Sequence, residues 1–321
     1  MLQYLVRRVL WAVVLFVAVT FVTYIIFYII PANPAALVAG RSPTEDAVRA
    51  AEKFLGTDQP VYVQYAKFMK RLVVDRSLGR SFATRQDVND IVLRAAPVTA
   101  SLVLGGALFW LMLSVPIGIL SALRPRSIMD RVTMVAVLIG ISAHPVWIGL
   151  IFAYVFGFKL GLTPISGYCD VINPSTECGG PVQWAYHMIL PWATFAVLFT
   201  ANYVRFIRAN VMETLNEDYV RTARAKGAPE GRVLRSHVLR NAMLTVVTIL
   251  GLDIGIALGG AIFTETVYGL PGLGQVAIES ITAFDLPITQ GVVVFGTLCI
   301  ILVNLFVDLF YAWIDPRIRL T

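Results

Sequence analysis

The chain of 321 residues carries 26 Lys and Arg against 20 Asp and Glu, yet only 14% of its residues are charged and 57% are apolar. A typical soluble domain is roughly 25% charged, and the mean hydropathy of this chain is high, at +0.74. The composition therefore argues against a disordered chain, a disulfide-stapled secreted scaffold and a conventional cytosolic enzyme.

The apolar residues are gathered in six blocks, and each block is about long enough to form a membrane-spanning helix. Such a helix needs roughly 20 residues to cross about 30 Å of hydrocarbon, where it must satisfy its own backbone hydrogen bonds. The blocks are residues 9–30, 95–123, 132–158, 188–204, 241–264 and 286–307. We therefore predict an all-α membrane protein with six transmembrane helices. A cleavable signal peptide is the alternative for the first block, but the length of the block favours a retained helix.

The basic residues between the blocks predict the orientation of the chain. If both termini are cytosolic, the interior segments hold 15 Lys and Arg, whereas the two short exterior segments hold only Lys159. This asymmetry agrees with the positive-inside rule, so the formal charge of +6 is an orientation signal and we predict no nucleic-acid partner. The topology divides the chain into an N-terminus with the first helix (1–30), an extracytoplasmic helical segment (31–94) and a five-helix core (95–321) with a cytosolic loop at 205–240.

The extracytoplasmic segment contains two predicted amphipathic helices. Ser42-Pro43-Thr44-Glu45 has the residues of a helix start. A second helix is predicted from Pro60, because Val61, Tyr65, Phe68 and Leu72 recur at helical spacing. Two interpretations remain open, namely a structural lid, which periodicity alone favours, and a docking surface for a soluble delivery protein.

Two of the three cysteines, Cys169 and Cys178, fall in one short exterior segment, where oxidation is possible. Spacing alone does not distinguish a disulfide from two free thiols. Cys299 lies within the sixth apolar block and is expected to pack there. The three histidines, His144, His187 and His237, are far apart in the sequence, and we predict no metal site.

The cytosolic loop is predicted to form two short helices around a corner. Glu217 and Asp218 suit a helix N-terminus, Gly227 ends the first helix and Pro229 begins a second. The small residues of the first helix would let a partner approach closely. This helix either transmits force from a motor to the membrane helices or lies on lipid headgroups as an ordinary interfacial helix.

The same loop resembles a known family. The loop contains Arg221-Thr222-Ala223, then Gly227 after three residues, and His237-Val238-Leu239 after nine more. This spacing is similar to that of the EAA loop of ABC importer permeases. It departs from the general pattern at Arg221, Thr222, His237 and Arg240. The longer run from Glu217 to Gly227, with residues 237–242, resembles the peptide-importer branch. Residues 55–65, 77–82 and 265–274 resemble further motifs of that branch, in the family's order.

The resemblance implies a type I ABC importer permease in the bacterial inner membrane that moves dipeptides or oligopeptides. It implies a second homologous permease subunit, two ATP-binding subunits that hold ATP and Mg, and an extracytoplasmic substrate-binding protein. No cofactor and no catalytic residue are expected on this chain, which lacks a Gly-x-x-x-x-Gly-Lys-[Ser/Thr] loop. Nickel and glutathione importers share the branch and remain alternatives. The residues expected to contact the ATP-binding subunits are Glu217, Asp218, Tyr219, Arg221, Thr222, Ala223, Lys226 and Gly227.

Two acidic residues lie within apolar blocks. A charge at mid-bilayer costs at least ~2.5 to 3.5 kcal/mol, so Asp253 should face a protein or water-lined interior. It either lines the translocation path and attracts cationic groups of the cargo, or forms a structural pair with an Asn, a Ser or a cation of the sister subunit. Asp308 is expected to meet water or Arg317, and residues 269–274 are expected to form a tight turn.

The main rival from another class is a proton-coupled secondary carrier. It would need a relay of acids or histidines within the membrane and often an inverted repeat. Asp253 and His144 make a thin relay, and no repeat is evident. A membrane-embedded enzyme would need converging nucleophile, base or metal ligands, and none converge in the sequence.

Overall fold

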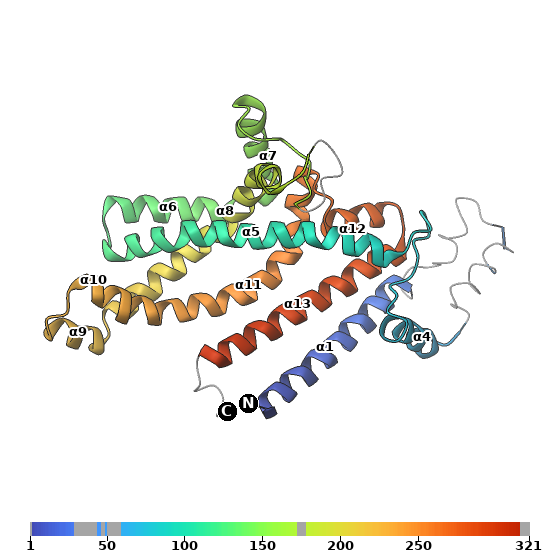
Figure 1. The fold of residues 1–321 in the computed structure, drawn as a ribbon, viewed down its shortest axis with the longest axis horizontal. Helices are drawn as coiled ribbons and strands as arrows, with labels where there is room; N and C mark the ends of the chain where they lie inside the picture. The colour runs from blue at the N-terminus through green and yellow to red at the C-terminus, as the bar shows by residue number, and fades with distance from the viewer. Residues whose placement is uncertain (1, 29–43, 46–48, 50–58, 172–177, 315–321) are drawn as a thin grey trace. The chain divides into compact units, whose positions relative to one another are not determined.

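A computed structural model describes residues 2–28, 44, 45, 49, 59–171 and 178–314 of the chain. Within those ranges helices are the only extended regular elements, beside two isolated bridges, so the all-α prediction is confirmed. The elements are α1 (Leu2–Tyr28), α4 (Val61–Val73), α5 (Val88–Leu123), α6 (Ile128–Ser142), α7 (Pro145–Phe152), η1 (Ala153–Lys159), α8 (Pro181–Leu215), α9 (Asp218–Ala225), α10 (Glu230–Arg232), η2 (Val233–Val238), α11 (Leu239–Tyr268), α12 (Leu273–Thr282) and α13 (Leu286–Ile314) (Figure 1). The elements η1 and η2 are π-helices.

Five of the described helices are long and apolar enough to cross a membrane. They are Val6–Phe27, Val88–Leu123, Pro181–Leu215, Glu230–Tyr268 and Leu286–Leu309. A sixth span exists only if Ile128–Ser142 and Pro145–Lys159 are counted together, and these two helices are bent by 107° at their junction. The third apolar block is therefore not the single continuous helix that hydropathy suggested.

Local chemistry at Pro145 explains the bend. A residue that precedes proline is pushed out of the α region, and His144 accordingly adopts an extended conformation with φ −76° and ψ 140°. Its Nδ1 then accepts a hydrogen bond from the backbone N–H of Val146 at 3.3 Å, which caps the new helix. One helix ends and another begins within three residues.

The segment 269–274 also differs from the expected tight turn. Gly269 ends α11 in the left-handed conformation with φ 59°, which suits glycine. The separate ten-residue helix α12 then begins at Leu273, before α13. The glycines therefore cap one helix and lead into another.

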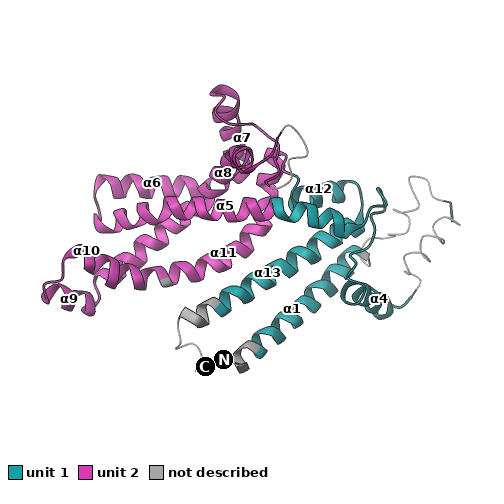
Figure 2. Cartoon of the chain, in the orientation of Figure 1, with its two compact units in different colours: residues 1–98, 271–321 teal, residues 99–270 magenta. Residues whose placement is uncertain are grey.

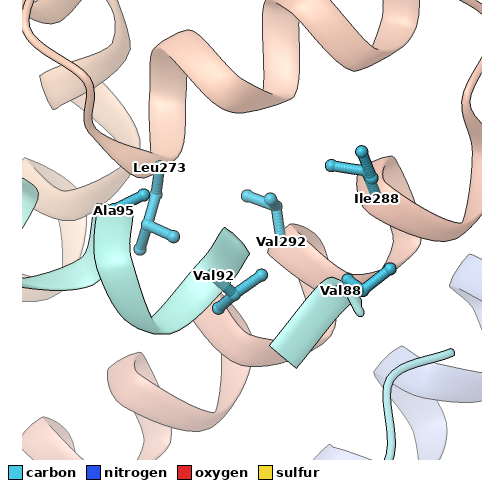
Figure 3. Packing of buried hydrophobic residues seen from close by; sticks show 6 residues of the cluster. All are labelled: Val88, Val92, Ala95, Leu273, Ile288 and Val292. Atoms are coloured by element: carbon cyan, nitrogen blue, oxygen red, sulfur yellow. The ribbon is translucent and has the colours of Figure 1, made fainter. Parts of the chain in front are cut away.

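The chain divides into two compact units, residues 1–98 with 271–321 and residues 99–270 (Figure 2). Figure 3 shows the apolar core of unit 1, where Val88, Val92 and Ala95 of α5 pack with Leu273 of α12 and with Ile288 and Val292 of α13. Each of these residues is at most 8% exposed. This unit also contains α1, which packs along α13.

The helix predicted from Pro60 is confirmed as α4. Its Phe68 is buried with Tyr24 of α1 and Val294 of α13, and Tyr65 and Leu72 pack against the same cluster. The Tyr24 hydroxyl donates a hydrogen bond to Gln64 Oε1 at 2.8 Å. The start of the other predicted helix, at Ser42, lies largely outside the described residues.

Asp308 has a partner other than the expected Arg317. Its Oδ2 lies 3.0 Å from Nη1 of Arg8, on α1. Because α1 and α13 pack along each other, a charge near the end of each apolar segment is paired with the opposite charge on its neighbour. Arg317 itself is outside the described residues.

A buried carboxylate fixes the loop between α4 and α5 in unit 1. Asp285 lies just before α13 and is 2% exposed. Its carboxylate accepts hydrogen bonds from the hydroxyl of Ser81 and from the backbone N–H groups of Phe82 (3.2 Å) and Ala83 (3.1 Å). These charge-assisted bonds hold one side of the loop, and Leu78 attaches the loop to the apolar core as well.

Replacing Asp285 with Asn is expected to destabilise the chain by about 2 kcal/mol, because an amide is neutral and offers one acceptor oxygen in place of two. The thermal midpoint of the purified protein in detergent measures this loss. Asp75→Asn is the matched control, because Asp75 is an exposed acid in the same segment. Equal midpoints for the two variants would contradict the attachment.

In unit 2, glycines on α5 let two aromatic rings of α8 approach its backbone. A Cβ at Gly105 would lie 2.2 Å from the indole of Trp192, and a Cβ at Gly106 would lie 2.6 Å from the ring of Phe195. The Trp192 Nε1 donates to the carbonyl oxygen of Ser101 at 2.9 Å. Small residues at a helix interface allow the close packing that holds membrane helices together.

Candidate functional site

The loop between α8 and α11 forms a short exposed helix, α9, of eight residues. Within unit 2, α9 lies at the opposite end from α7 (Figure 1). The helix predicted from Glu217 is confirmed, and Asp218 in its first turn interacts favourably with the helix dipole. After α9 the chain turns at Gly227, whose φ of 78° is in the left-handed region.

Three contacts attach α9 to the rest of unit 2. Val220 is fully buried, and α9 packs on η2, whose Val233 and Val238 are also fully buried. The hydroxyl of Tyr219 accepts a hydrogen bond from Nδ2 of Asn241 at 2.7 Å. Arg224 forms a bidentate ion pair with Glu230, in which Nε and Nη2 lie 2.8 and 3.3 Å from the two carboxylate oxygens. The helix is therefore anchored on one face and at its C-terminal corner.

The opposite face of α9 is exposed. Among the eight residues that sequence reasoning selected, Ala223 is half-buried and the other seven are exposed. Lys226 ends the helix, and its backbone N–H donates to the Thr222 carbonyl at 3.0 Å. The structure thus brings these eight residues together on a small protruding element. The coupling role itself stays a prediction.

The second helix of the loop is not a separate element. α10 and η2 run directly into α11, and the apolar segment is continuous from Glu230 to Tyr268. The helix that begins after Pro229 is therefore the first part of the fifth apolar helix. A displacement of α9 would act on that helix directly, because α9 packs on η2.

Sequence reasoning missed a buried ion pair in unit 2. Asp130 of α6 is 4% exposed, and its two carboxylate oxygens accept from Nε and Nη2 of Arg208 on α8 at 2.7 and 2.9 Å. The hydroxyl of Ser121 and the backbone N–H of Arg126 also donate to this carboxylate. The pair therefore joins α5, the turn after it, α6 and α8. Its one local signal is Ser127, whose hydroxyl accepts from the Asp130 N–H at the start of α6.

Asp253 lies in the middle of α11 and is partly buried. Its carboxylate lies beside the hydroxyl of Tyr203 on α8, and the Tyr203 side chain is fully buried. The structural partner expected from the sequence was an Asn, a Ser or a cation of the sister subunit. The structure instead brings the Tyr203 hydroxyl of the same chain near this carboxylate, without a hydrogen bond between them.

In the structure, Cys169 and Cys178 are joined by a disulfide with Cα atoms 5.3 Å apart. His187 Nδ1 lies 3.1 Å from the Cys169 sulfur, and the three side chains form a group whose potential ligand atoms lie within 4.8 Å of one another. Sequence spacing did not indicate this group, because His187 reaches the cysteines from the second turn of α8. Burial also raises the pKa of the adjacent Tyr168 hydroxyl above its usual range.

An open hollow of 710 Å³ lies at the bend between α6 and α7. Its polar groups are those of Ser142 and His144, and the rest of its lining is mainly apolar, with Trp147 61% exposed. The lining residues carry no carboxylate, lysine or arginine. The hollow therefore suits an apolar neighbour better than a charged cofactor.

Comparison with known proteins covers almost the whole chain. The family model described as the binding-protein-dependent transport system inner membrane component matches residues 114–320, and the model of its N-terminal part matches residues 1–103. The dipeptide transport system permease protein DppB of Escherichia coli K12 is 36% identical, over 99% of this chain and 99% of its own length. DppB of Alkalihalophilus pseudofirmus is 34% identical, over 99% of this chain and all of its own length. A di/tripeptide transport system permease protein of Pseudomonas aeruginosa is 35% identical, over 99% of both chains.

Proposed function

Because this chain belongs to the family of inner-membrane components of binding-protein-dependent transport systems, we propose that it is the permease subunit of an ATP-driven peptide importer. The observation that carries the proposal is its similarity, over nearly its full length, to permeases named for dipeptide and di/tripeptide transport. Those names favour peptide cargo over nickel or glutathione. The chain is a multi-pass protein of the bacterial inner membrane, in keeping with its family and its apolar helices.

The chain works within a larger assembly. A second homologous permease completes the membrane path, two ATP-binding subunits hydrolyse ATP with Mg in the cytosol, and a substrate-binding protein delivers peptide on the other side. Both termini and α9 are then cytosolic, and residues 31–94 are extracytoplasmic. The permease itself performs no chemistry on the peptide and alternates between outward-open and inward-open states.

The exposed face of α9 receives the movement of an ATP-binding subunit. Its support is the EAA-like pattern of residues 221–239 together with the exposure of the eight selected residues. The packing of Val220 and the contacts of Tyr219 and Arg224 then pass that movement to η2, α11 and α10. A photo-crosslinker at Thr222 should join an ATP-binding subunit in the intact complex, and one at Lys159 should not. The interfacial-helix alternative predicts crosslinks from Thr222 to lipid only.

The class of transporter is tested with the whole assembly in liposomes. Uptake of a labelled dipeptide should stop when ATP hydrolysis by the partner subunits is blocked, whether or not a pH gradient is present. Uptake that follows the proton gradient without ATP would instead establish a proton-coupled secondary carrier.

Tyr219→Phe removes one hydroxyl and leaves the ring. We expect a fall of about two- to tenfold in peptide taken up per ATP hydrolysed, because the lost hydrogen bond to Asn241 contributes about 0.5 to 1.5 kcal/mol to the attachment of α9. Uptake and ATP hydrolysis are measured on the same liposomes. Tyr62→Phe, at an exposed tyrosine of α4, is the control and should change neither quantity. An unchanged ratio in Tyr219→Phe would contradict the role of this attachment.

Asp253 is proposed to line the translocation path and to attract cationic groups of the cargo. Asp253→Asn removes the charge and keeps a polar side chain of the same size. If the proposal is correct, uptake of a lysine-containing dipeptide falls more than uptake of a neutral one. Equal uptake of both would leave the carboxylate with a structural role beside Tyr203.

A further inference from the structure

The disulfide between Cys169 and Cys178 has two sulfurs in different surroundings. Cys169 is 1% exposed, whereas Cys178 is only partly buried. An incoming thiolate must approach the sulfur that it attacks, along the axis of the S–S bond. The exposures of the two residues therefore favour attack at Cys178, with the sulfur of Cys169 as the leaving group.

The leaving group has an imidazole beside it. Nδ1 of His187 lies 3.1 Å from the Cys169 sulfur and 2.9 Å from the carbonyl oxygen of Gln183, one helical turn earlier in α8. Because a carbonyl oxygen only accepts, Nδ1 carries the proton and directs it to both acceptors. A neighbouring N–H, and more strongly an imidazolium, stabilises a thiolate and makes it a better leaving group.

The ends of the loop are held together by contacts other than the disulfide. Asp170 and Gly179 form an isolated backbone bridge, and the N–H of Gly180 donates to the carbonyl of Asp170 at 3.1 Å. The N–H of Gly167 also donates to the carbonyl of Tyr268, at the end of α11, at 3.0 Å. Opening the S–S bond therefore leaves the two sulfurs close enough to join again.

From this arrangement we infer that Cys178 is a thiol-exchange site for small thiol compounds, and that His187 is its positioning residue. A thiolate RS⁻ attacks the Cys178 sulfur, forms an R–S–S–Cys178 bond and breaks the bond to Cys169, which leaves as a thiolate. The reductant is the incoming thiol. Return attack by the Cys169 thiolate on Cys178 expels RS⁻ and restores the disulfide.

The test uses the full chain in a Cys299→Ser background, which removes the remaining free thiol. The oxidised protein is treated with glutathione in the presence of EDTA, quenched with N-ethylmaleimide and analysed by peptide mass spectrometry. We expect glutathione on Cys178 and maleimide on Cys169, in at least about tenfold excess over the reverse pattern, since attack follows the accessible sulfur. Equal adducts on both cysteines, or no adduct until the protein is denatured, would overturn the inference.

The role of His187 is tested with His187→Gln, which keeps a polar side chain of similar length without a titratable ring. We expect exchange to slow by about three- to tenfold, because the ring N–H that stabilises the leaving Cys169 thiolate is removed. Tyr186→Phe, at the adjacent exposed position, is the matched control and should exchange at the original rate. Both variants should keep the original thermal midpoint, which shows that they are folded. An unchanged exchange rate in His187→Gln would refute the positioning role.

Discussion

Asp130→Ala is expected to destabilise the chain by about 3 to 5 kcal/mol, because it leaves the guanidinium of Arg208 largely buried without its counter-ion. The carboxylate accepts from four donors on α5, the following turn and α8, and all four lose their acceptor together. We expect the thermal midpoint of the purified protein to fall by roughly 10 °C.

A double-mutant cycle separates the pair from its surroundings. Asp130→Ala with Arg208→Met removes both charges, and it should recover much of the loss because no uncompensated charge stays buried. Asp218→Ala is the exposed control. The Asp218–Arg221 pair is 3.7 Å apart with side chains 98% and 69% exposed, so its loss should cost less than about 0.5 kcal/mol. A loss in Asp130→Ala as small as in this control would show that the pair contributes little.

The same pair bears on transport. Arg208 lies on α8, which continues to Leu215 and leads into α9. The ion pair therefore holds α6 and the turn before it against α8, the helix that leads to α9. Arg208→Lys keeps the charge but loses the bidentate contact with Asp130. It should therefore lower peptide uptake per ATP hydrolysed while the assembly still forms.

Gly105→Ala is expected to cost about 3 kcal/mol, because the added methyl group would lie 2.2 Å from the indole of Trp192. The ring must move, and its Nε1 then loses the bond to the carbonyl of Ser101. The midpoint of thermal unfolding in detergent measures the effect. Trp192 fluorescence is not a clean alternative readout, because the chain has six tryptophans.

Gly259→Ala makes the matched comparison. Gly259 is also a helical glycine, but a Cβ there meets no atom within 4 Å. Alanine is a better helix former than glycine by up to about 1 kcal/mol, so this variant should be neutral or more stable. Opposite signs for the two substitutions would show that the close approach of α8 to α5 decides the effect. Equal midpoints would mean that the Trp192 ring can move without cost.

Several elements could be predicted from the sequence because their signals are local. Hydropathy over about 20 residues located the five long apolar helices. Turn and cap residues located the start of α4 after Pro60 and the end of α9 before Gly227. The EAA-like spacing selected the exposed residues of α9, since exposure there follows from a short polar helix between two long apolar ones.

The sequence was less informative where helices interact. Hydropathy did not predict the bend of 107° between α6 and α7, because a window average is insensitive to one His-Pro step. The sequence also did not indicate the ion pair between Asp308 and Arg8, which come from opposite ends of the chain.

By itself, the sequence determined that this chain is a helical membrane protein, where most of its apolar helices lie and that a small polar helix separates two of them. Only the tertiary structure decided which polar groups meet: Asp130 with Arg208, and His187 with Cys169. The reason is physical. Hydrophobicity and helix capping depend on neighbours along the chain, whereas a pair between two helices depends on their rotation and depth, which the packing of all the side chains between them sets.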